Sequence, residues 1–584
     1  MNASMGDVRG GTPDGTTRGI PGGGPADAGG GPDGGALATL ALAPRPPART
    51  RSSRTRPSRR DRPPAESTTG RPGPRLPGPV AMGWTLCALF FSLYAIVSVR
   101  RHERMLSAGY DLGIFEQAVR AYAHGHAPVA GLKGPGFDLL GDHFHPILAL
   151  LAPLYRLFPG PLTLLLAQAA LMALACLPLT RWAHRVAGPV AGLVVGCATG
   201  ASWGIASAIG FDFHEIAFAV PLLAFSMEAL GRSRWTAAVL WAAPLLLVKE
   251  DLGLTLAAVG LYVAWHGPRR LGLVTAVAGV TGTAVEVLVL LPAANPHGTF
   301  DYWHQMSATH SASGTGGMVA AAVHAVTHLC RPPLKLLLLA MLAGMTAGVG
   351  PRSPITALCL PTLAWRLLSA DPHYWGVGYH YSAVLMPIVL AGLVDVLARR
   401  PELRAPATLR RILTVVGLFA LVTTAVYPLH DVVLPSTWRT SAHVRTAHRL
   451  ADRIPNGATV AASNRLAPLL TDRATVSLVC QGSGAPGTGR AALPARLPAW
   501  VVVDRTDPTT KSPCSTTETT RMLTAYRADG YRTVADENGI LLLRGPFHPA
   551  GVAMAPGRIR GASRVRPDAV VVGGGRSARG AEQP

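Results

Sequence analysis

Long apolar segments alternate with short polar gaps from residue 82 to residue 428. A helix that crosses a hydrocarbon core of ~30 Å needs roughly 17 to 25 mainly apolar residues, and these segments have about that length. The pattern predicts about 11 transmembrane helices, at 82–99, 161–179, 187–208, 216–231, 235–249, 251–266, 271–291, 334–350, 354–369, 380–398 and 411–428. We therefore expect an α-helical polytopic membrane protein.

The two ends of the chain differ from the apolar region in composition. Residues 1–80 are rich in Gly, Pro, Arg and Ser, which predicts a disordered basic tail followed by a retained first span rather than a cleaved signal peptide. Beyond 430, short Val-rich runs such as "AWVVVDRTDP" alternate with helical patterns and predict a small α/β domain over 431–548. Residues 549–584 return to low complexity and are expected to form a second disordered tail.

Charge orients the predicted spans. The gaps "RWAHR", "GRSR" and "HGPRR" are basic, which places them in the cytoplasm with the N-terminal tail. An odd number of spans then places the C-terminal domain outside the cytoplasmic membrane. The chain is 49% hydrophobic and only 15% charged. The basic residues behind its net charge of +22 lie in the N-terminal tail, in the short gaps between apolar runs and in the C-terminal segment. No nucleic-acid reading module is visible, so we expect no nucleic-acid partner.

The other gaps hold nearly all the acidic, His and aromatic residues of the membrane region. They read "YDLGIFEQ", "GDHFHP", "FDFHE", "VKEDLG", "NPHGTFDYWHQ" and "DPHYWGVGYHY", and the alternation places all of them on the outer face. A plain loop needs only to be polar. The concentration of these residue types on one side therefore indicates chemistry at the outer face.

Asp111 and Glu116 open this set, shortly after the first span. The apolar positions that follow predict an amphipathic helix on the outer interface with Asp111 at its N-cap: Ile114, Phe115, Ala118, Val119 and Tyr122. Two interpretations of Asp111 stand side by side. It is either a capping carboxylate on a surface helix or a base that accepts a proton from a substrate hydroxyl.

The two short His motifs also allow two interpretations. In "GDHFHP", Asp142, His143 and His145 suit a divalent metal or a phosphate, or Asp142 only caps the helix from 146. In "FDFHE", an extended chain would place Asp212 and His214 on one face, with Glu215 pointing away.

Further candidates lie in the later outer gaps. Lys249, Glu250 and Asp251 interrupt an apolar run and either face a cavity or form a tight hairpin between two spans. The residues around Tyr379, His380 and Tyr381 form either an interfacial aromatic belt or, with Arg366, a site for a lipid phosphate.

Cys480 and Cys514 stand apart from the other cysteines, in the polar C-terminal region. If this region lies outside the cytoplasm, a disulfide between them is favoured; otherwise they are two unpaired thiols.

Several long motifs of this sequence are similar to those of a known family. They are "YDLGIFEQ", "GDHFHPILALLAPLYRLFP", "FDFHEIAF" and "VKEDLGL" in the membrane region, and "ASNRLAPLLTDR" and "WVVVD" in the C-terminal domain. Over about 82–545 the sequence resembles the uncharacterised bacterial membrane proteins grouped as domain of unknown function 2079. That family is similar to the GT-C class of multi-span glycosyltransferases, which use polyprenyl-phosphate sugars on the outer face of the membrane. The resemblance implies a GT-C-like fold for residues 81–430. It also implies that Asp111 is the catalytic base or acceptor-orienting group, with Glu116 as the weaker candidate.

These observations give a functional hypothesis. The protein transfers a sugar from a polyprenyl-phosphate donor to a glycan, lipid or protein acceptor, with the donor phosphate near His143, His214, Lys249 or His380. The sequence predicts no certain cofactor, and a divalent metal is the one candidate. The alternatives are a transporter or flippase of a lipid-linked envelope precursor, for which Glu228 and Glu286 are the main mid-span charges, and a non-catalytic envelope scaffold.

Overall fold

The computed structural model describes residues 77–300, 333–369, 371–481, 494, 496–507 and 513–546. The predicted tails lie outside these ranges, except for residues 77–80. Asp301 and the rest of "DYWHQ" also lie outside them.

Helices dominate the first two thirds of the described chain. The first loop, residues 104–160, follows α1 (Pro79–Glu103) and holds the π-helical turn η1 (Gly109–Gly113), then α2 (Ile114–Ala123), η2 (Leu139–Gly141), η3 (Pro146–Leu151) and α3 (Ala152–Leu157). The membrane region continues with α4 (Pro161–Leu174), α5 (Cys176–Gly200), α6 (Trp203–Ile209), η4 (Glu215–Ala217), α7 (Ala219–Gly231), α8 (Trp235–Ala242), η5 (Ala243–Leu247), α9 (Leu252–His266), α10 (Arg269–Val285), η6 (Glu286–Leu290) and α11 (Leu291–Ala294). After the gap come α14 (Pro333–Gly344), η7 (Gly350–Arg352), η8 (Thr356–Cys359), α15 (Leu360–Leu368), α16 (Pro372–Trp375), η9 (His380–Ser382), α17 (Leu385–Arg399), η10 (Pro401–Arg404) and α18 (Pro406–Val426).

Five helices in the described ranges are long and apolar enough to cross a membrane: Pro79–Glu103, Pro161–Ile209, Arg269–Ala294, His380–Arg399 and Pro406–Val426. Shorter apolar helices of 10 to 17 residues include Trp235–Leu247, Leu252–His266, Pro333–Gly344 and Thr356–Leu368. Each predicted span coincides with one of these helices or with α7. The run from Pro161 is broken at Gly188, whose φ of 87° no helix permits, so it forms two segments.

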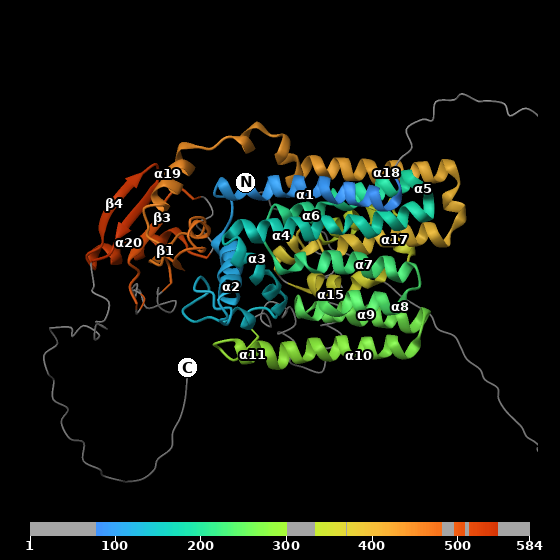
Figure 1. Cartoon of the computed structure of the whole chain (residues 1–584), viewed down its shortest axis with the longest axis horizontal. Helices are drawn as coiled ribbons and strands as arrows, with labels where there is room; N and C mark the ends of the chain where they lie inside the picture. Colours follow the sequence, from blue (N-terminus) through green and yellow to red (C-terminus); the bar gives the residue numbers. More distant parts are fainter. Residues whose placement is uncertain are drawn as a thin grey trace, which may run out of the picture. The chain divides into compact units, whose positions relative to one another are not determined.

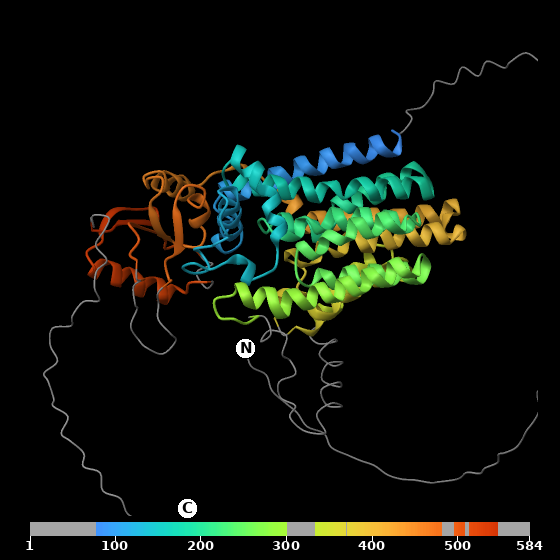
Figure 2. The same ribbon diagram turned by 60° about the horizontal axis from the view of Figure 1, so that its bottom comes forward.

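Exposure separates the lipid-facing helices from the central one. Val274 and Leu288 on the α10 side are 68% and 66% exposed, and Leu421 of α18 is 67% exposed. Apolar faces of this extent are stable against lipid rather than water. By contrast, nearly every side chain of α17 is buried, and this helix runs among the others in both ribbon views (Figures 1 and 2). The protein is a mostly helical multi-span membrane protein.

Close packing joins α9 to α10. A Cβ on Gly260 would lie 2.4 Å from the backbone nitrogen of Ala276, and one on Gly279 would lie 2.4 Å from the carbonyl oxygen of Gly253. Small residues therefore let the two backbones touch, as they do in many membrane helix pairs. This rigid pair forms one wall of the cavity described below.

The C-terminal region forms a mixed five-stranded sheet with the strand order β2-β1-β3-β5-β4. Its strands are β1 (Thr459–Ala462), β2 (Thr475–Leu478), β3 (Trp500–Asp504), β4 (Arg532–Glu537) and β5 (Ile540–Arg544). β1 pairs in parallel with β2 and β3, whereas β5 pairs antiparallel with β3 and β4. The connections include η13 (Ala467–Leu469), α19 (Ala442–Ala451) and α20 (Thr516–Ala528), and the turns η11 (Pro428–Val433) and η12 (Pro435–Trp438) lead from α18 to this region.

Local sequence explains the ends of these elements. Asn538 and Gly539 have φ values of 48° and 84°, the conformation that an Asn-Gly turn supplies between β4 and β5. Ser515 and Glu518 form a capping box at the start of α20. Cys480 and Cys514 form a disulfide with their Cα atoms 5.5 Å apart, which ties the end of β2 to the segment before α20.

Hydrogen bonds attach the sheet to the first loop. The backbone nitrogens of Gly109 and Tyr110 donate to the backbone oxygen and to Oδ1 of Asn464, at 2.7 and 2.8 Å. Arg120 of α2 donates to the carbonyl oxygens of Thr471 and Ala474 at 3.0 and 2.9 Å. The loop that carries Asp111 is thus held on one side by the C-terminal region.

Candidate functional site

Asp111 lies in the η1 turn and does not cap α2. The N-cap of α2 is Gly113, and no side chain caps this helix end, so the capping prediction is wrong. Asp111 lies two residues before this N-cap, inside the π turn, and its side chain is 28% exposed. Its Oδ1 lies 3.4 Å from Nε2 of His214. π turns of this kind often occur at functional sites.

His214 stacks on His380, with the two ring centroids 3.7 Å apart. Both residues are buried, and neither Nδ1 atom has a hydrogen-bond partner among the described residues. Phe211 packs against both rings, at 5.5 Å from each. The burial of His380 does not fit the interfacial belt interpretation, because a belt residue would face the membrane surface.

Asp212 anchors the loop that carries Asp111. Its φ of 81° is not extended, so the expected shared face of Asp212 and His214 is wrong. Its Oδ2 instead accepts a hydrogen bond of 2.8 Å from the backbone nitrogen of Ala108. Burial, and then the nearby charge of Asp111, raise the pKa of Asp212 to about 6.

Glu215 turns inward and pairs with Lys249, whose Nζ lies 3.0 Å from Glu215 Oε1. Its side chain is only 1% exposed and therefore points into the protein. Burial opposes the ionisation of Glu215, but Lys249 and the imidazoles of His214 and His145 outweigh it and lower the pKa of Glu215 to about 2. The pair is ionised at neutral pH.

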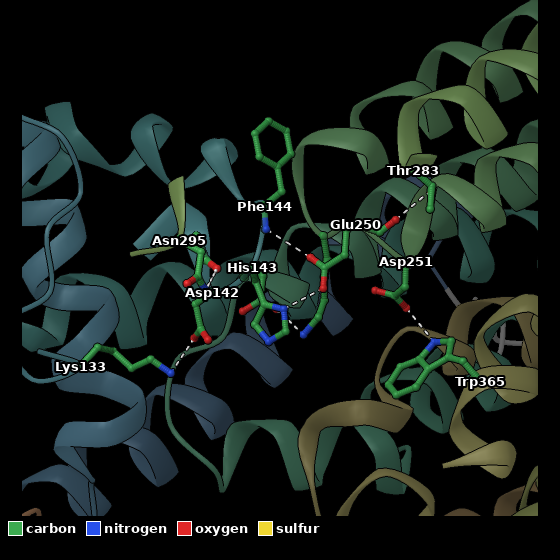
Figure 3. A network of polar contacts seen from close by, with 12 residues as sticks. Lys133, Asp142, His143, Phe144, Glu250, Asp251, Thr283, Asn295 and Trp365 are labelled. Carbon is green, nitrogen blue, oxygen red and sulfur yellow. Dashed lines mark hydrogen bonds and ion pairs between the residues drawn. The ribbon is translucent and has the colours of Figure 1, made fainter. Parts of the chain in front are cut away.

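His143 and Glu250 form a second ion pair (Figure 3). Nδ1 of His143 lies 2.7 Å from Oε1 of Glu250, whose other oxygen accepts a 3.2 Å hydrogen bond from the backbone nitrogen of Phe144. Burial opposes the charge of Glu250, but His143 and Lys249 together lower the pKa of this carboxyl. Asp251 accepts a hydrogen bond of 2.9 Å from Trp365 Nε1.

Asp142 pairs with Lys133 at 3.0 Å rather than capping the following helix, whose N-cap His145 makes no side-chain bond there. His143 and His145 also contact different neighbours. The His145 ring packs on Phe115, with the centroids 5.7 Å apart. The two imidazoles therefore belong to different groups of side chains.

A cavity of about 410 Å³ adjoins the Glu250 network. His143, Lys249, Glu250 and Asp251 give it a charged side, and its remaining wall is largely apolar: Leu254, Val280, Ala284, Val287, Leu288, Phe300 and Trp365. Val280 and Leu288 are 54% and 66% exposed, so the apolar wall includes side chains on the lipid-facing side of α10 and η6. The cavity thus joins a charged site to the lipid-facing surface.

Arg366 is fully buried and organises the loop that carries His380 and Tyr381. Its guanidinium donates to the carbonyl oxygens of Tyr374 and Tyr381, at 2.6 and 3.1 Å, and to Oγ of Ser382 at 3.1 Å. These contacts position the ring of Tyr381, which lies 4.1 Å from the ring of His380. Binding of a phosphate by Arg366 remains a prediction.

Glu116 does not join this group of side chains. It is fully buried and accepts hydrogen bonds from the hydroxyl of Tyr155, at 3.0 Å, and from that of Thr471 in the C-terminal region. Burial raises the pKa of Glu116 to about 8. Its contacts indicate a place in the junction between α2 and the sheet region.

No group of three His, Cys, Asp or Glu side chains in the described part of the chain is arranged to hold a metal ion. The carboxylates of Asp142, Glu215 and Glu250 face Lys133, Lys249 and His143 instead. The described donor sets therefore do not fit a divalent cation.

Sequence reasoning missed several residues that build the site. Gln168 of α4 donates to the carbonyl oxygen of Asp212 at 2.6 Å and accepts from the backbone nitrogen of His214 at 2.9 Å. A lone Gln inside "LLLAQAALM" was the available signal, because a polar side chain within a span usually has a partner. Lys133 and Trp365 carried no comparable signal.

A family model described as "Predicted membrane protein (DUF2079)" matches residues 101–542. The chain belongs to the DUF2079 family. The prediction from the motifs is confirmed. A comparison with curated proteins found no match.

Two crystal structures of ArnT from Cupriavidus metallidurans are similar in fold to this DUF2079 protein. The structure bound to undecaprenyl phosphate has 15% sequence identity and a TM-score of 0.47, and the alignment covers 80% of this chain and 100% of that chain. The apo structure has the same identity and coverage, with a TM-score of 0.45.

Proposed function

We propose that this DUF2079 protein transfers a sugar from a polyprenyl-phosphate donor to an acceptor on the outer face of the cytoplasmic membrane. The observation that carries the proposal is the cavity with a charged side and an apolar, lipid-facing wall. A polyprenyl-phosphate sugar has the same division, with a long apolar chain at one end and a phosphate and a sugar at the other.

Each part of such a donor has a matching surface. The apolar side chains of α9, α10 and η6 suit the prenyl chain, and Lys249 and His143 suit the phosphate. The carboxylates of Glu250 and Asp251 are acceptors for sugar hydroxyls. They would also repel a phosphate, so the phosphate belongs on the side of Lys249 rather than beside Asp251.

The proposed reaction is an inverting displacement. An acceptor hydroxyl attacks the anomeric carbon, the bond between that carbon and the phosphate oxygen breaks, and the polyprenyl phosphate leaves with the electron pair. Asp111 takes the hydroxyl proton, since its carboxylate is partly exposed and lies beside His214. Lys249 and the stacked imidazoles of His214 and His380 stabilise the departing phosphate.

Replacement of the base is the direct test. Purified protein in lipid nanodiscs is supplied with radiolabelled polyprenyl-phosphate sugars from membrane extracts, and the label that leaves the donor is measured. Asp111→Asn should reduce transfer by roughly 10²-fold or more, the usual contribution of a positioned base. Binding of undecaprenyl phosphate by native mass spectrometry should be unchanged.

Asp431→Asn is the matched control. The Asp431 side chain is 22% exposed and lies 3.6 Å from the imidazole of His430, much as Asp111 lies beside His214. Asp431 belongs to η11, however, and its neighbour is not the imidazole that stacks on His380. This variant should transfer sugar at the wild-type rate. Full activity in correctly inserted Asp111→Asn would refute the role of Asp111.

Charges within the spans bear on the transporter alternative. Glu228 is buried at the end of α7 and is paired with Arg181, Arg185 and Arg232. Such a fully paired carboxylate is suited to holding helices together rather than to binding cargo. Movement of the donor lipid between leaflets without its consumption would nevertheless favour the transporter in the same assay.

A further inference from the structure

A second hollow lies between the first loop and the sheet, outside the cavity just described. It is a cleft of about 1210 Å³. Its walls come from α2, from the loop at 124–136, from β1 and β2, and from residues 494 and 496–498. The two linings share no described residue. They are nevertheless adjacent, because Lys133 lines the cleft and pairs with Asp142, the neighbour of His143 in the cavity.

Hydrogen bonds fix the walls of the cleft. The side chain of Gln117 accepts from the backbone nitrogen of Leu132 at 3.0 Å and donates to the carbonyl oxygen of Val476 at 2.8 Å. Gln481 donates to the carbonyl oxygens of Gly131 and Leu132, at 2.8 and 2.7 Å. The loop is therefore bonded both to α2 and to Gln481 after the edge strand β2, and α2 is bonded to β2 itself, so the cleft is preformed.

The charge of the cleft has one sign. Its described lining includes Arg120, Lys133 and Arg496, together with His124 and His126, and no described lining residue is acidic. Arg120 and Lys133 have protein partners. Arg496 is exposed and forms no ion pair with any residue that the structure describes, so its charge is available to a ligand.

Hydroxyl groups and small apolar surfaces complete the lining. Thr475 and Ser477 alternate along β2 and face away from the buried Val476, and Thr459 is opposite Thr475 on β1. Pro135 and Leu497 also line the cleft. Hydroxyls pair with the hydroxyls of a sugar, and apolar side chains pack on the apolar face of a sugar ring.

We infer that this cleft binds the acceptor, and that the acceptor is an anionic glycan carrying phosphate or carboxylate groups. The role of this glycan as the acceptor rests on the proposed function, whereas the binding of an anionic glycan follows from the cleft alone. Lys133 lies between the cleft and the proposed catalytic residues, because its Nζ is also 5.3 Å from the centre of the ring of Tyr110, the neighbour of Asp111 in the sequence. The acceptor thus approaches Asp111 from the side of the sheet and the donor from the side of the lipid.

Binding is measured on the full chain in nanodiscs by fluorescence polarisation with three labelled probes: poly(glycerol phosphate), oligogalacturonate and neutral maltoheptaose. We expect one or both anionic probes to bind, with an affinity that falls as salt increases, and maltoheptaose to bind at least tenfold more weakly. Which anionic probe binds more tightly distinguishes phosphate from carboxylate. Arg496→Glu should weaken anionic binding roughly fivefold, the effect of about 1 kcal/mol at an exposed charge.

Arg532→Glu is the matched control, since Arg532 is an exposed residue of β4, at the edge of the sheet opposite β2. The net charge of +22 attracts any polyanion, and both variants reduce it equally. Equal weakening by the two variants, or equal binding of maltoheptaose, would overturn the inference.

Asp111→Asn should bind the anionic probe as the wild type does. Probe binding in the absence of any sugar transfer would refute the proposed function and leave the cleft assignment standing. Sugar transfer to a neutral acceptor, with no binding of either anionic probe, would refute the cleft assignment and leave the proposed function standing.

Discussion

Lys249 is the residue on which the charged side of the cavity depends. Its side chain is 12% exposed and lies beside Glu215 and Glu250, two carboxylates that it helps to keep ionised. A buried pair contributes little net stability, but the loss of one partner leaves an uncompensated charge. The pair therefore lets stability be separated from ligand binding.

Lys249→Met should destabilise the protein by about 3 to 5 kcal/mol, because Glu215 remains buried without its partner. The double variant Glu215→Leu with Lys249→Met should recover most of that loss, since it buries no charge. Thermal unfolding in detergent measures both effects.

Binding then separates the structural role from the ligand role. If Lys249 binds the donor phosphate, the double variant should still bind undecaprenyl phosphate at least tenfold more weakly than the wild type in native mass spectrometry. Wild-type binding in a stable double variant would contradict the assignment of Lys249.

At the scale of elements, α2 connects the membrane region to the sheet. Its apolar positions Ile114, Phe115, Ala118 and Val119 are buried, as its periodicity predicts. Its polar positions Gln117 and Arg120 donate to the carbonyl oxygens of the C-terminal region. A helix predicted to lie at an interface is therefore covered by protein on both its apolar and its polar side.

Glu116 makes this junction sensitive to pH. Burial raises the pKa of Glu116 from its ordinary 4.5 to about 8, so the folded state holds a proton that the unfolded state releases. The associated stabilisation is fully present below about pH 4.5 and is lost as the pH rises to about 8. Glu116→Gln should remove this dependence and be more stable relative to the wild type at pH 8.5 than at pH 5.

Thermal unfolding between pH 5 and 9 measures the difference, and Glu103→Gln is the control because Glu103 is exposed. The Glu103 variant should follow the wild-type profile throughout. Parallel profiles for Glu116→Gln and the wild type would show that Glu116 has an ordinary pKa in the folded protein.

At the scale of the whole molecule, the sheet region and the basic ends of the helices are proposed to lie on opposite sides of the membrane. Arg532 lies on β4, and Arg269 is the first residue of α10 and part of the basic gap at 266–270; both are exposed. In intact cells, a membrane-impermeant maleimide should label Arg532→Cys. It should label Arg269→Cys only after permeabilisation.

The wild type supplies the background in this experiment, because its described free cysteines are buried or half-buried and Cys480 and Cys514 form a disulfide. Labelling of Arg269→Cys in intact cells, with protection of Arg532→Cys, would reverse the orientation and place the proposed site in the cytoplasm.

The sequence by itself determined the apolar helices, the family, the position of α2 and the gathering of acidic and His residues in one set of gaps. These features follow from local rules, since the length of an apolar run and the period of a helix do not depend on distant contacts. It also placed strands where β1 to β5 form.

Only the tertiary structure decided which of those side chains meet. The left-handed conformation of Asp212, the inward turn of Glu215, the stacking of His214 on His380 and the removal of Glu116 to the junction all depend on contacts between segments tens to hundreds of residues apart. The fold determines which side chains lie close enough to pair with a buried charge. The order of residues along the chain does not contain the distances between segments that are far apart in sequence. The site was therefore predictable as a set of loops, but not as a set of contacts.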